Sequence, residues 1–376
     1  MTPNVTYPGV YVEEVPSGVR TISGVSTCVT AFVGTTPGGE LNQPVRVFNV
    51  LNFEQIFGGL TPESELGYSV RQFFTNGGTE AWVVRIPDNP TDEQWRVGIN
   101  ALDSVDLFNL LVLPGVTSLS LVAMAVAYCE NRRAFLILDS PREARTPDEI
   151  LQRVESGDLT HSCNAAVYYP WINVPDPLKN GSPRLSSPSG TIAGLFARTD
   201  ASRSLWKAPT GTDASLHNVT ALDYQLSVKE NALLNPRAIN CLRSFPANGI
   251  VAWGARTLAG DDAFASEYKY IPVRRLALYI EESLFRGTKW VVFEPNGEPL
   301  WAQIRLNIGA FMLNLFRQGA FQGVTPQQAY FVKCDTETTT ASDIARGIVN
   351  IIVGFAPTKP AEFVVLKIAQ TAHLPQ

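Results

Sequence analysis

The chain has 376 residues, a net charge of −5, 45% hydrophobic residues and 17% charged residues, which is typical of two or three well-packed globular domains. This balance gives no reason to expect nucleic acid, and no run of eighteen apolar residues could span a membrane. The first residues have neither the positive nor the apolar region of a signal peptide. Five scattered cysteines without a C-x-x-C pair are typical of reduced thiols in a protein made in the cytoplasm.

The first twenty residues alternate like a β-strand. Val10 and Val12 would face one side and Tyr11 the other. A joint at residues 16–18 separates them from a second strand at 25–34. A strand at a chain end can close a sheet in its own subunit or pair with the open edge of another chain. The residues alone leave both possibilities open.

The region from residue 44 to residue 170 alternates strands and helices. Strands are predicted at 44–48 and 81–87, and helices at 52–59, with Asn52 as N-cap, and at 65–78. Three continuous apolar strands follow at 109–115, 134–140 and 164–170, separated by helices at 118–131 and 146–155. Apolar strands that alternate with helices indicate a mostly parallel sheet covered on both faces.

The next region is rich in loops. The four prolines between residues 173 and 190 indicate a surface excursion. Helices are expected near 189–198 and 224–234, followed by strands at 238–243 and 249–255 that return the chain to a C-terminal domain.

The last hundred residues carry the most regular pattern. A helix from Pro272 to Gly287 precedes a short strand from Trp290 to Phe293. A longer helix then places these residues on one face: Trp301, Ile304, Ile308, Phe311, Met312 and Leu315. Because Leu306, Leu313 and Phe316 lie off that face, we expect this helix to be buried on two sides. Strands at 328–335, 347–357 and 361–370 complete the chain.

The search for chemistry finds little. The glycine-rich segment 32–39 lacks the lysine end of a phosphate loop, and the His161–Cys163 pair lacks further zinc ligands. Two acidic pairs, Asp261 with Asp262 and Asp335 with Glu337, are interpreted as solvated turn residues. We therefore predict no catalytic residue, no cofactor and no metal site. The rival hypothesis is a cytosolic α/β enzyme whose lid is the loop 173–190 or 209–217.

Several segments together resemble one known family. "RRLALYIEESLFRGTKWVVFEPNGEPLW", "YFVKCDTETTT" and "VGFAPTKPAEFVVLKIAQ" are similar to the C-terminal domain of contractile tail sheath proteins of phages and phage-tail-like injection particles. "YPGVYVEEV" resembles the N-terminal arm of that family, and "LWKAPTG" and "FPANGIVAWGARTL" match within the chain. The matches cover both ends and roughly the last 130 residues.

The resemblance implies an α/β and α+β fold. The expected subunit is compact and has two domains: a mixed sheet with flanking helices, and an α+β C-terminal domain with strand-exchanging terminal arms. We expect an N-terminal arm at 1–24, an outer α/β domain at 25–255, an inner sheath domain at 256–360 and a C-terminal arm at 361–376.

The resemblance also implies how the arms work. They would add strands to neighbouring subunits through Tyr7, Val10, Tyr11 and Val12 at one end and Phe363, Val364, Val365, Leu366 and Ile368 at the other. Burying the C-terminal apolar side chains contributes at most roughly 8 to 15 kcal/mol, which nearly cancels the roughly 8 to 16 kcal/mol needed to order about eight residues. Such an arm should dock only on a preformed sheet, so removing the last sixteen residues should abolish assembly and leave a folded subunit.

The implied function is that of a structural subunit made in the cytoplasm and assembled into a phage tail or phage-tail-like particle. It would form stacked rings around an inner tube protein, with baseplate and terminator or cap proteins at the ends, and contract to drive the tube through a target envelope. Arg305 and Arg317 are candidates for tube contact, although a surface role or an internal salt bridge is equally open. A non-contractile shell protein is the alternative within the structural class.

Overall fold

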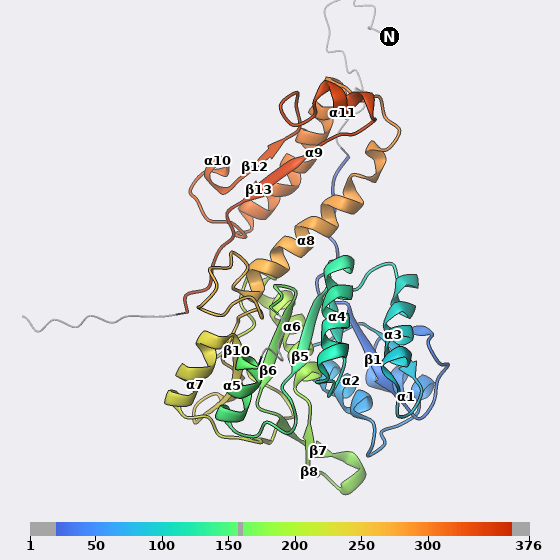
Figure 1. The fold of residues 1–376 in the computed structure, drawn as a ribbon, viewed down its shortest axis with the longest axis vertical. Helices are drawn as coiled ribbons and strands as arrows, with labels where there is room; N and C mark the ends of the chain where they lie inside the picture. The colour runs from blue at the N-terminus through green and yellow to red at the C-terminus, as the bar shows by residue number, and fades with distance from the viewer. Residues whose placement is uncertain (1–19, 157–160, 363–376) are drawn as a thin grey trace, which may run out of the picture. The chain divides into compact units, whose positions relative to one another are not determined.

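The computed structural model describes residues 20–156 and 161–362, and these fall into two compact units. Of the described residues, the larger unit holds 25–156, 161–281 and 358–362, and the smaller unit holds 20–24 and 282–357 (Figure 1). The sequence analysis placed the domain boundary after residue 255, whereas residues 256–281 lie in the larger unit. They do so because their backbone bonds to its sheet, with the Leu258 amide donating to the Ala165 carbonyl at 2.8 Å.

An eight-stranded sheet forms the centre of the larger unit. Its order is β11-β10-β6-β5-β4-β1-β3-β2, and only the two outer strands are antiparallel to their neighbours. This confirms the predicted mostly parallel sheet. The strands are β1 (Thr30–Thr35), β2 (Pro44–Val47), β3 (Ala81–Ile86), β4 (Leu110–Val112), β5 (Phe135–Asp139), β6 (Ala165–Tyr169), β10 (Ile239–Phe245) and β11 (Gly249–Ala252).

Helices cover both faces of this sheet. Along β1, Ala31 and Val33 pack into one apolar cluster and Phe32 into the other, because alternate side chains of a strand point to opposite faces. The first cluster contains residues of α3 (Asp92–Asn100), α4 (Leu119–Arg132), α5 (Pro147–Glu155) and α7 (Val228–Leu234). The second contains residues of α1 (Val50–Phe57), α2 (Glu65–Thr75), α6 (Ser189–Arg203) and the start of α8 (Ile271–Gly287).

Helices α2 and α6 approach each other closely because α6 carries two glycines at the contact. A Cβ at Gly190 would lie 2.4 Å from the Ser69 carbonyl oxygen, and a Cβ at Gly194 would lie 2.4 Å from that of Phe73. Only residues without a side chain allow this backbone-to-backbone packing. The two glycines therefore place α6 against α2.

Three local predictions for the larger unit were wrong or incomplete. The N-cap of α1 is Asn49, whose side chain accepts from the Asn52 amide, so Asn52 lies inside the helix. Helix α3 was not predicted. The loop expected at 173–190 contains a hairpin of β7 (Ile172–Asp176) and β8 (Ser182–Ser186), flanked by β9 (Ala221–Leu222).

The prolines of that hairpin do not prevent pairing. Pro175 lies opposite Pro183 in the ladder. Neither residue has an N–H group, so the pair occupies a position where no ladder hydrogen bond is needed. Short 3-10 helices complete the larger unit: η1 (Ala101–Ser104), η2 (Pro177–Lys179) and η3 (Asn235–Arg237).

The smaller unit is an α+β assembly built around one long helix. Helix α9 (Glu298–Arg317) packs on strand β12 (Tyr330–Lys333), which pairs with β13 (Ile352–Phe355). Its remaining elements are the end of α8, η4 (Lys289–Val291), α10 (Pro326–Ala329) and α11 (Ala341–Ala345). None of the helices in residues 20–156 and 161–362 is both long and apolar enough to cross a bilayer.

The strand predicted from Trp290 to Phe293 is wrong. The segment continues from α8 as η4, with the Val291 amide donating to the Thr288 carbonyl. Val292 and Phe293 are then 63% and 103% exposed, and Phe293 has φ +70°. A run of four apolar residues does not distinguish a strand from a helical turn by its period, and within the described residues no strand pairs with this segment.

Candidate assembly surfaces

The predicted arm residues lie outside the described residues. This holds for Tyr7, Val10, Tyr11 and Val12, and for the apolar residues from Phe363 to Ile368. The arms therefore remain a prediction, and the structure bears on them through the surfaces and the anchoring points that it does describe.

The two-stranded sheet of the smaller unit is a candidate acceptor for a further strand. β12 and β13 pair in antiparallel register, with Tyr330 opposite Phe355 and Lys333 opposite Ile352. Across residues 20–156 and 161–362, no other named strand joins this sheet. Phe331 and Ile352 are about half exposed beside these open edges. Unpaired strand edges with apolar neighbours are a template for added strands.

The start of the described chain is fixed to the smaller unit. The Arg20 amide donates to the Asn307 side-chain oxygen at 3.1 Å, and the Arg20 guanidinium lies 4.8 Å from the Trp290 ring centroid. Ile22 is buried against Gly287, where a Cβ would lie 2.6 Å from the Ile22 Cγ2. Residues 20–22 are therefore held by the end of α8, by η4 and by α9.

The other end of the described chain is fixed to the larger unit by Glu362. Its carboxylate accepts hydrogen bonds from Arg256, Asn235 and Tyr270. Burial by itself would raise the pKa of Glu362, but the hydrogen bonds from these groups outweigh it and lower the pKa below its usual value. Neither Glu362 nor Arg256 was predicted, because the apolar residues after Glu362 gave the stronger signal and no local spacing links Glu362 to Arg256.

The two candidate tube-contact residues differ in their surroundings. Arg305 donates to the Glu298 carboxylate at 2.5 Å and to the Cys334 carbonyl. Arg317 is exposed at the C-terminal end of α9. Arg305 thus has an internal partner, as the alternative interpretation allowed, whereas Arg317 presents its charge to solvent.

Helix α9 buries one face rather than two. The predicted inward residues, from Trp301 to Leu315, are buried. However, Leu306 is 54% exposed, and Leu313 and Phe316 are only half-buried. The prediction of burial on two sides is wrong for the single chain, so an apolar stripe on α9 faces solvent.

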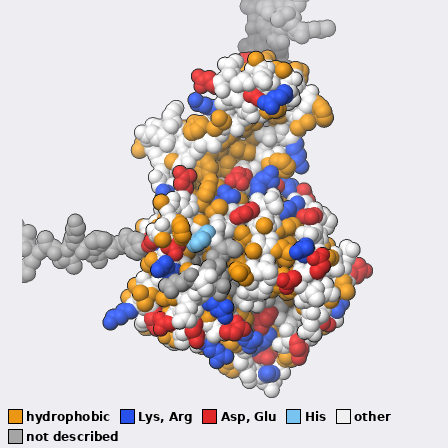
Figure 2. Space-filling view, viewed as in Figure 1, with side chains coloured by type: hydrophobic (Ala, Val, Ile, Leu, Met, Phe, Trp, Pro, Cys, Tyr) orange, Lys and Arg blue, Asp and Glu red, His pale blue; other side chains and the backbone are white. Residues whose placement is uncertain are grey.

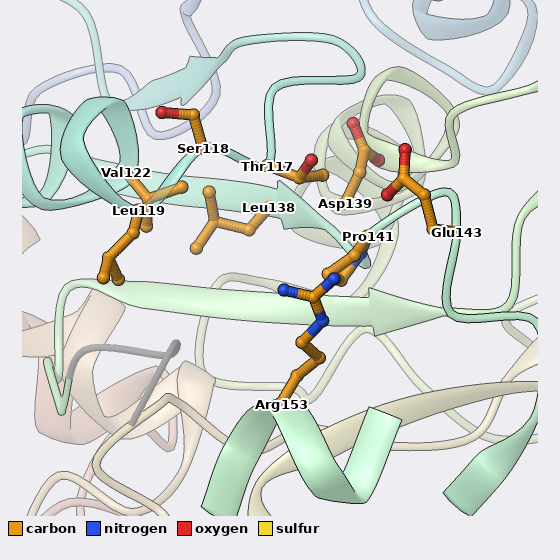
Figure 3. A pocket seen from close by; sticks show the side chains of 9 residues that line it. All are labelled: Thr117, Ser118, Leu119, Val122, Leu138, Asp139, Pro141, Glu143 and Arg153. Carbon is orange, nitrogen blue, oxygen red and sulfur yellow. The ribbon is translucent and has the colours of Figure 1, made fainter. Parts of the chain in front are cut away.

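One cavity of the larger unit lies where the rival enzyme hypothesis would place an active site. It has a volume of about 210 Å³ and lies at the carboxyl end of β5, where α4 begins (Figure 3). These residues line it: Thr117, Ser118, Leu119, Val122, Leu138, Asp139, Pro141, Glu143 and Arg153. Ligands of parallel α/β sheets bind at such strand ends.

The buried acid of this cavity is engaged by the protein itself. Asp139 Oδ1 accepts from the Ser189 amide at 2.8 Å, and Oδ2 accepts from the Gly115 amide at 2.9 Å and the Ser189 hydroxyl at 2.8 Å. Burial raises the pKa of Asp139 to about 6, although these hydrogen bonds oppose the shift. The carboxylate thus joins α6, through both oxygens, to the loop after β4, through Oδ2, which is a structural role.

The acidic pairs singled out in the sequence also make hydrogen bonds that stabilise local turns. Asp335 accepts from the Glu337 and Thr338 amides, as expected of a turn residue. The solvated interpretation is wrong for Asp261, which is buried and caps the Ala263 amide. Among the described residues, no three His, Cys, Asp or Glu side chains are placed to hold a metal ion.

Comparisons with known proteins match this chain to tail sheath proteins. The model of the phage tail sheath protein central domain matches residues 89–258, and that of the phage tail sheath C-terminal domain matches residues 265–371. A prophage major tail sheath protein of Pseudomonas aeruginosa (strain UCBPP-PA14) is 29% identical over 278 residues, which cover 71% of this chain and 67% of the relative.

Similarity to a solved structure extends over almost the whole chain. The sheath complex of an extracellular contractile injection system, PVC, in its contracted state matches with a TM-score of 0.82 and 28% identity, covering 97% of this chain and 98% of that chain. The tail sheath protein of Enterobacteria phage T4 is 28% identical over 188 residues, which cover 48% of this chain and 26% of that protein. The chain belongs to the contractile tail sheath family, and its fold is the α/β and α+β fold of a sheath subunit.

Proposed function

We propose that copies of the chain polymerise around an inner tube as a contractile sheath. The sheath would then contract and drive the tube through a target envelope. The observation that carries this proposal is the match, over 97% of the chain, to a sheath subunit in its contracted state. Contacts between subunits that do not close into a ring generate helical filaments. The energy would come from subunit contacts formed on contraction, with no enzymatic step.

The open-edged sheet of the smaller unit supports a strand-exchange mechanism. In this proposal the arms, at residues 1–24 and 361–376, add strands to β12 and β13 of neighbouring subunits. Main-chain hydrogen bonds would give affinity, and apolar side chains such as Val364 and Leu366 would give register. The smaller unit would then be the inner domain of the sheath, and the larger unit the outer one.

Similarity over nearly full length supports a compact sheath subunit. The chain and the PVC sheath chain cover each other by 97% and 98%. On the face seen in Figure 2, acidic and basic side chains of the larger unit are intermingled. We infer a compact sheath whose partners are copies of itself, a tube protein, and baseplate and cap proteins.

Electron microscopy of the purified chain tests this proposal directly. Negatively stained samples of the concentrated chain, alone and with the tube protein of the same particle, are expected to contain striated tubes or hollow cylinders. A non-contractile shell protein would give closed particles, or cylinders that occur in one state only and never in a contracted one. Monomers that persist under both conditions would contradict the proposal.

Arg317 provides a test of the surface that meets the tube. We expect Arg317→Glu to lower tube-dependent assembly about tenfold, which corresponds to about 1.4 kcal/mol, because an exposed cation would be replaced by an anion. Arg317→Lys keeps the charge and is the matched control. Sedimentation of sheath with tube measures the effect. Equal assembly of the Glu and Lys variants would remove Arg317 from the tube surface.

A further inference from the structure

The chain returns to the larger unit after the smaller one is complete, and Glu362 is where it becomes fixed. Lys359 and Ala361 are exposed, whereas the Glu362 side chain is 18% exposed. Glu362 Oε1 accepts from Arg256 Nε at 2.7 Å and Asn235 Nδ2 at 2.8 Å. Oε2 accepts from Arg256 Nη2 at 3.0 Å and the Tyr270 hydroxyl at 2.8 Å. Four donors thus converge on one carboxylate.

The cation that holds Glu362 is part of the core of the larger unit. Arg256 is 1% exposed, and its Nη1 donates to the Gly260 carbonyl at 3.1 Å and to Asp262 at 2.9 Å. Asn240 fixes its backbone by accepting from the Arg256 amide and donating to the Arg256 carbonyl, both at 2.7 Å. A displacement of Glu362 away from the larger unit would not move the guanidinium with it, because the other partners of Arg256 belong to that unit.

We propose that the Arg256–Glu362 pair anchors the root of the C-terminal arm, so that the strand offered to a second copy of this chain begins after residue 362. The inference rests on the proposed function. Tension on an engaged arm would then pass to the core of the larger unit through one bidentate ion pair. The register of the added strand would be fixed from the same point, because the anchor sets how far each later residue reaches.

The structure suggests a variant that releases the anchor with little change in volume. In Glu362→Gln one carboxylate oxygen becomes an NH₂ group. In the parent chain each carboxylate oxygen accepts from two donors. Either orientation of the amide in the variant would therefore place its NH₂ group against two other donors. The side chain keeps its size but loses at least two of its four hydrogen bonds.

Asp262→Asn is the matched control. Asp262 is the other carboxylate on Arg256 and also pairs with Lys269 at 2.6 Å. It lies in the loop after Gly260 and not in the arm. This variant therefore weakens the same ion cluster while Glu362 keeps its hydrogen bonds. A purely stabilising role of the cluster predicts similar behaviour of the two variants, and an anchoring role predicts a difference.

A nitroxide label at residue 361, introduced by Ala361→Cys, reports on the anchor in the isolated chain. Ala361 is exposed, so the label does not displace core atoms. The parent chain treated with the same reagent gives the background from Cys28 and Cys163, the native thiols that are not buried. Assembly is measured on the unlabelled variants as the yield of cylinders in sedimentation and electron microscopy.

With Glu362→Gln we expect the spectrum of the label to narrow to that of a freely rotating nitroxide and the cylinder yield to fall at least tenfold. With Asp262→Asn we expect the label spectrum and the cylinder yield to stay at the parental level, even if the two variants lower the Tm equally. An unchanged spectrum in Glu362→Gln, or equal narrowing in both variants, would overturn the anchor. Failure of the parent chain to assemble would count against the proposed function, while the spectra would still decide on the anchor.

Discussion

A chain that ends at Phe363 is expected to fold normally and to form no sheath. This truncation removes Val364, Val365, Leu366 and Ile368, the apolar residues proposed to pair with a neighbouring subunit. It keeps Glu362 and its partners in the larger unit. We expect the concentration needed for assembly to rise at least a hundredfold, which corresponds to about 2.7 kcal/mol per subunit, and the Tm to stay within about 2 °C of the full chain.

Comparison with a longer truncation separates the effect of the arm from the effect of its anchor. A chain that ends at Pro360, without the last sixteen residues, also loses Glu362, and Arg256 is left buried without its bidentate partner. Removing one member of a buried ion pair costs about 3 to 5 kcal/mol, so this chain should unfold at a lower temperature. The sequence predicts that this chain stays folded, and the loss of Glu362 adds the expectation that its stability is lower. Cylinders formed by the chain ending at Phe363 would contradict the arm proposal.

Asp200→Ala should destabilise the larger unit more than other single charge removals. Asp200 and Arg275 join α6 to α8 through two hydrogen bonds of 2.9 and 2.7 Å, and their side chains are 6% and 3% exposed. Without Asp200, Arg275 is a buried cation that keeps the Thr27 carbonyl, the Cys28 thiol and the face of the Phe196 ring but has lost its carboxylate. We expect a loss of about 3 to 5 kcal/mol, seen as a fall in Tm on the order of 10 °C.

The first control is an exposed ion pair made by the same helix, and the second is a double variant. Asp213 pairs with Arg203 of α6, but the two side chains are 73% and 59% exposed. Asp213→Ala should therefore change stability by less than about 1 kcal/mol. The double variant Asp200→Leu with Arg275→Met should recover most of the loss, because similar apolar volume replaces the ion pair. A Tm for Asp200→Ala equal to that of Asp213→Ala would disprove the argument.

Cys28 is half-buried beside this ion pair, and its thiol is held in the protonated form there. Its thiol donates to Asp200 at 3.0 Å, and burial, together with the charge of Asp200, raises the thiol pKa well above its usual value. A thiol that stays protonated is a poor nucleophile. The cysteine therefore contributes a hydrogen bond to the junction of β1, α6 and α8.

Local sequence patterns predicted the elements that depend on nearby residues. The apolar strands β4, β5 and β6 were recognised because both faces of a covered parallel strand are apolar. Helices α8 and α9 were recognised by their spacing. The same signals failed at Trp290–Phe293 and at β7 and β8, where a short apolar run and paired prolines do not reveal whether a partner strand is present.

The sequence by itself determined the family, the mostly parallel sheet and the apolar ends that make the chain a candidate for strand exchange. Only the tertiary structure decided which charges are buried together. Arg275 lies 75 residues from Asp200, and Arg256 lies 106 residues from Glu362. No local spacing links such residues, because the pairing is set by which elements the sheet brings side by side. The attachment of Glu362 to the larger unit could therefore be found only from the structure.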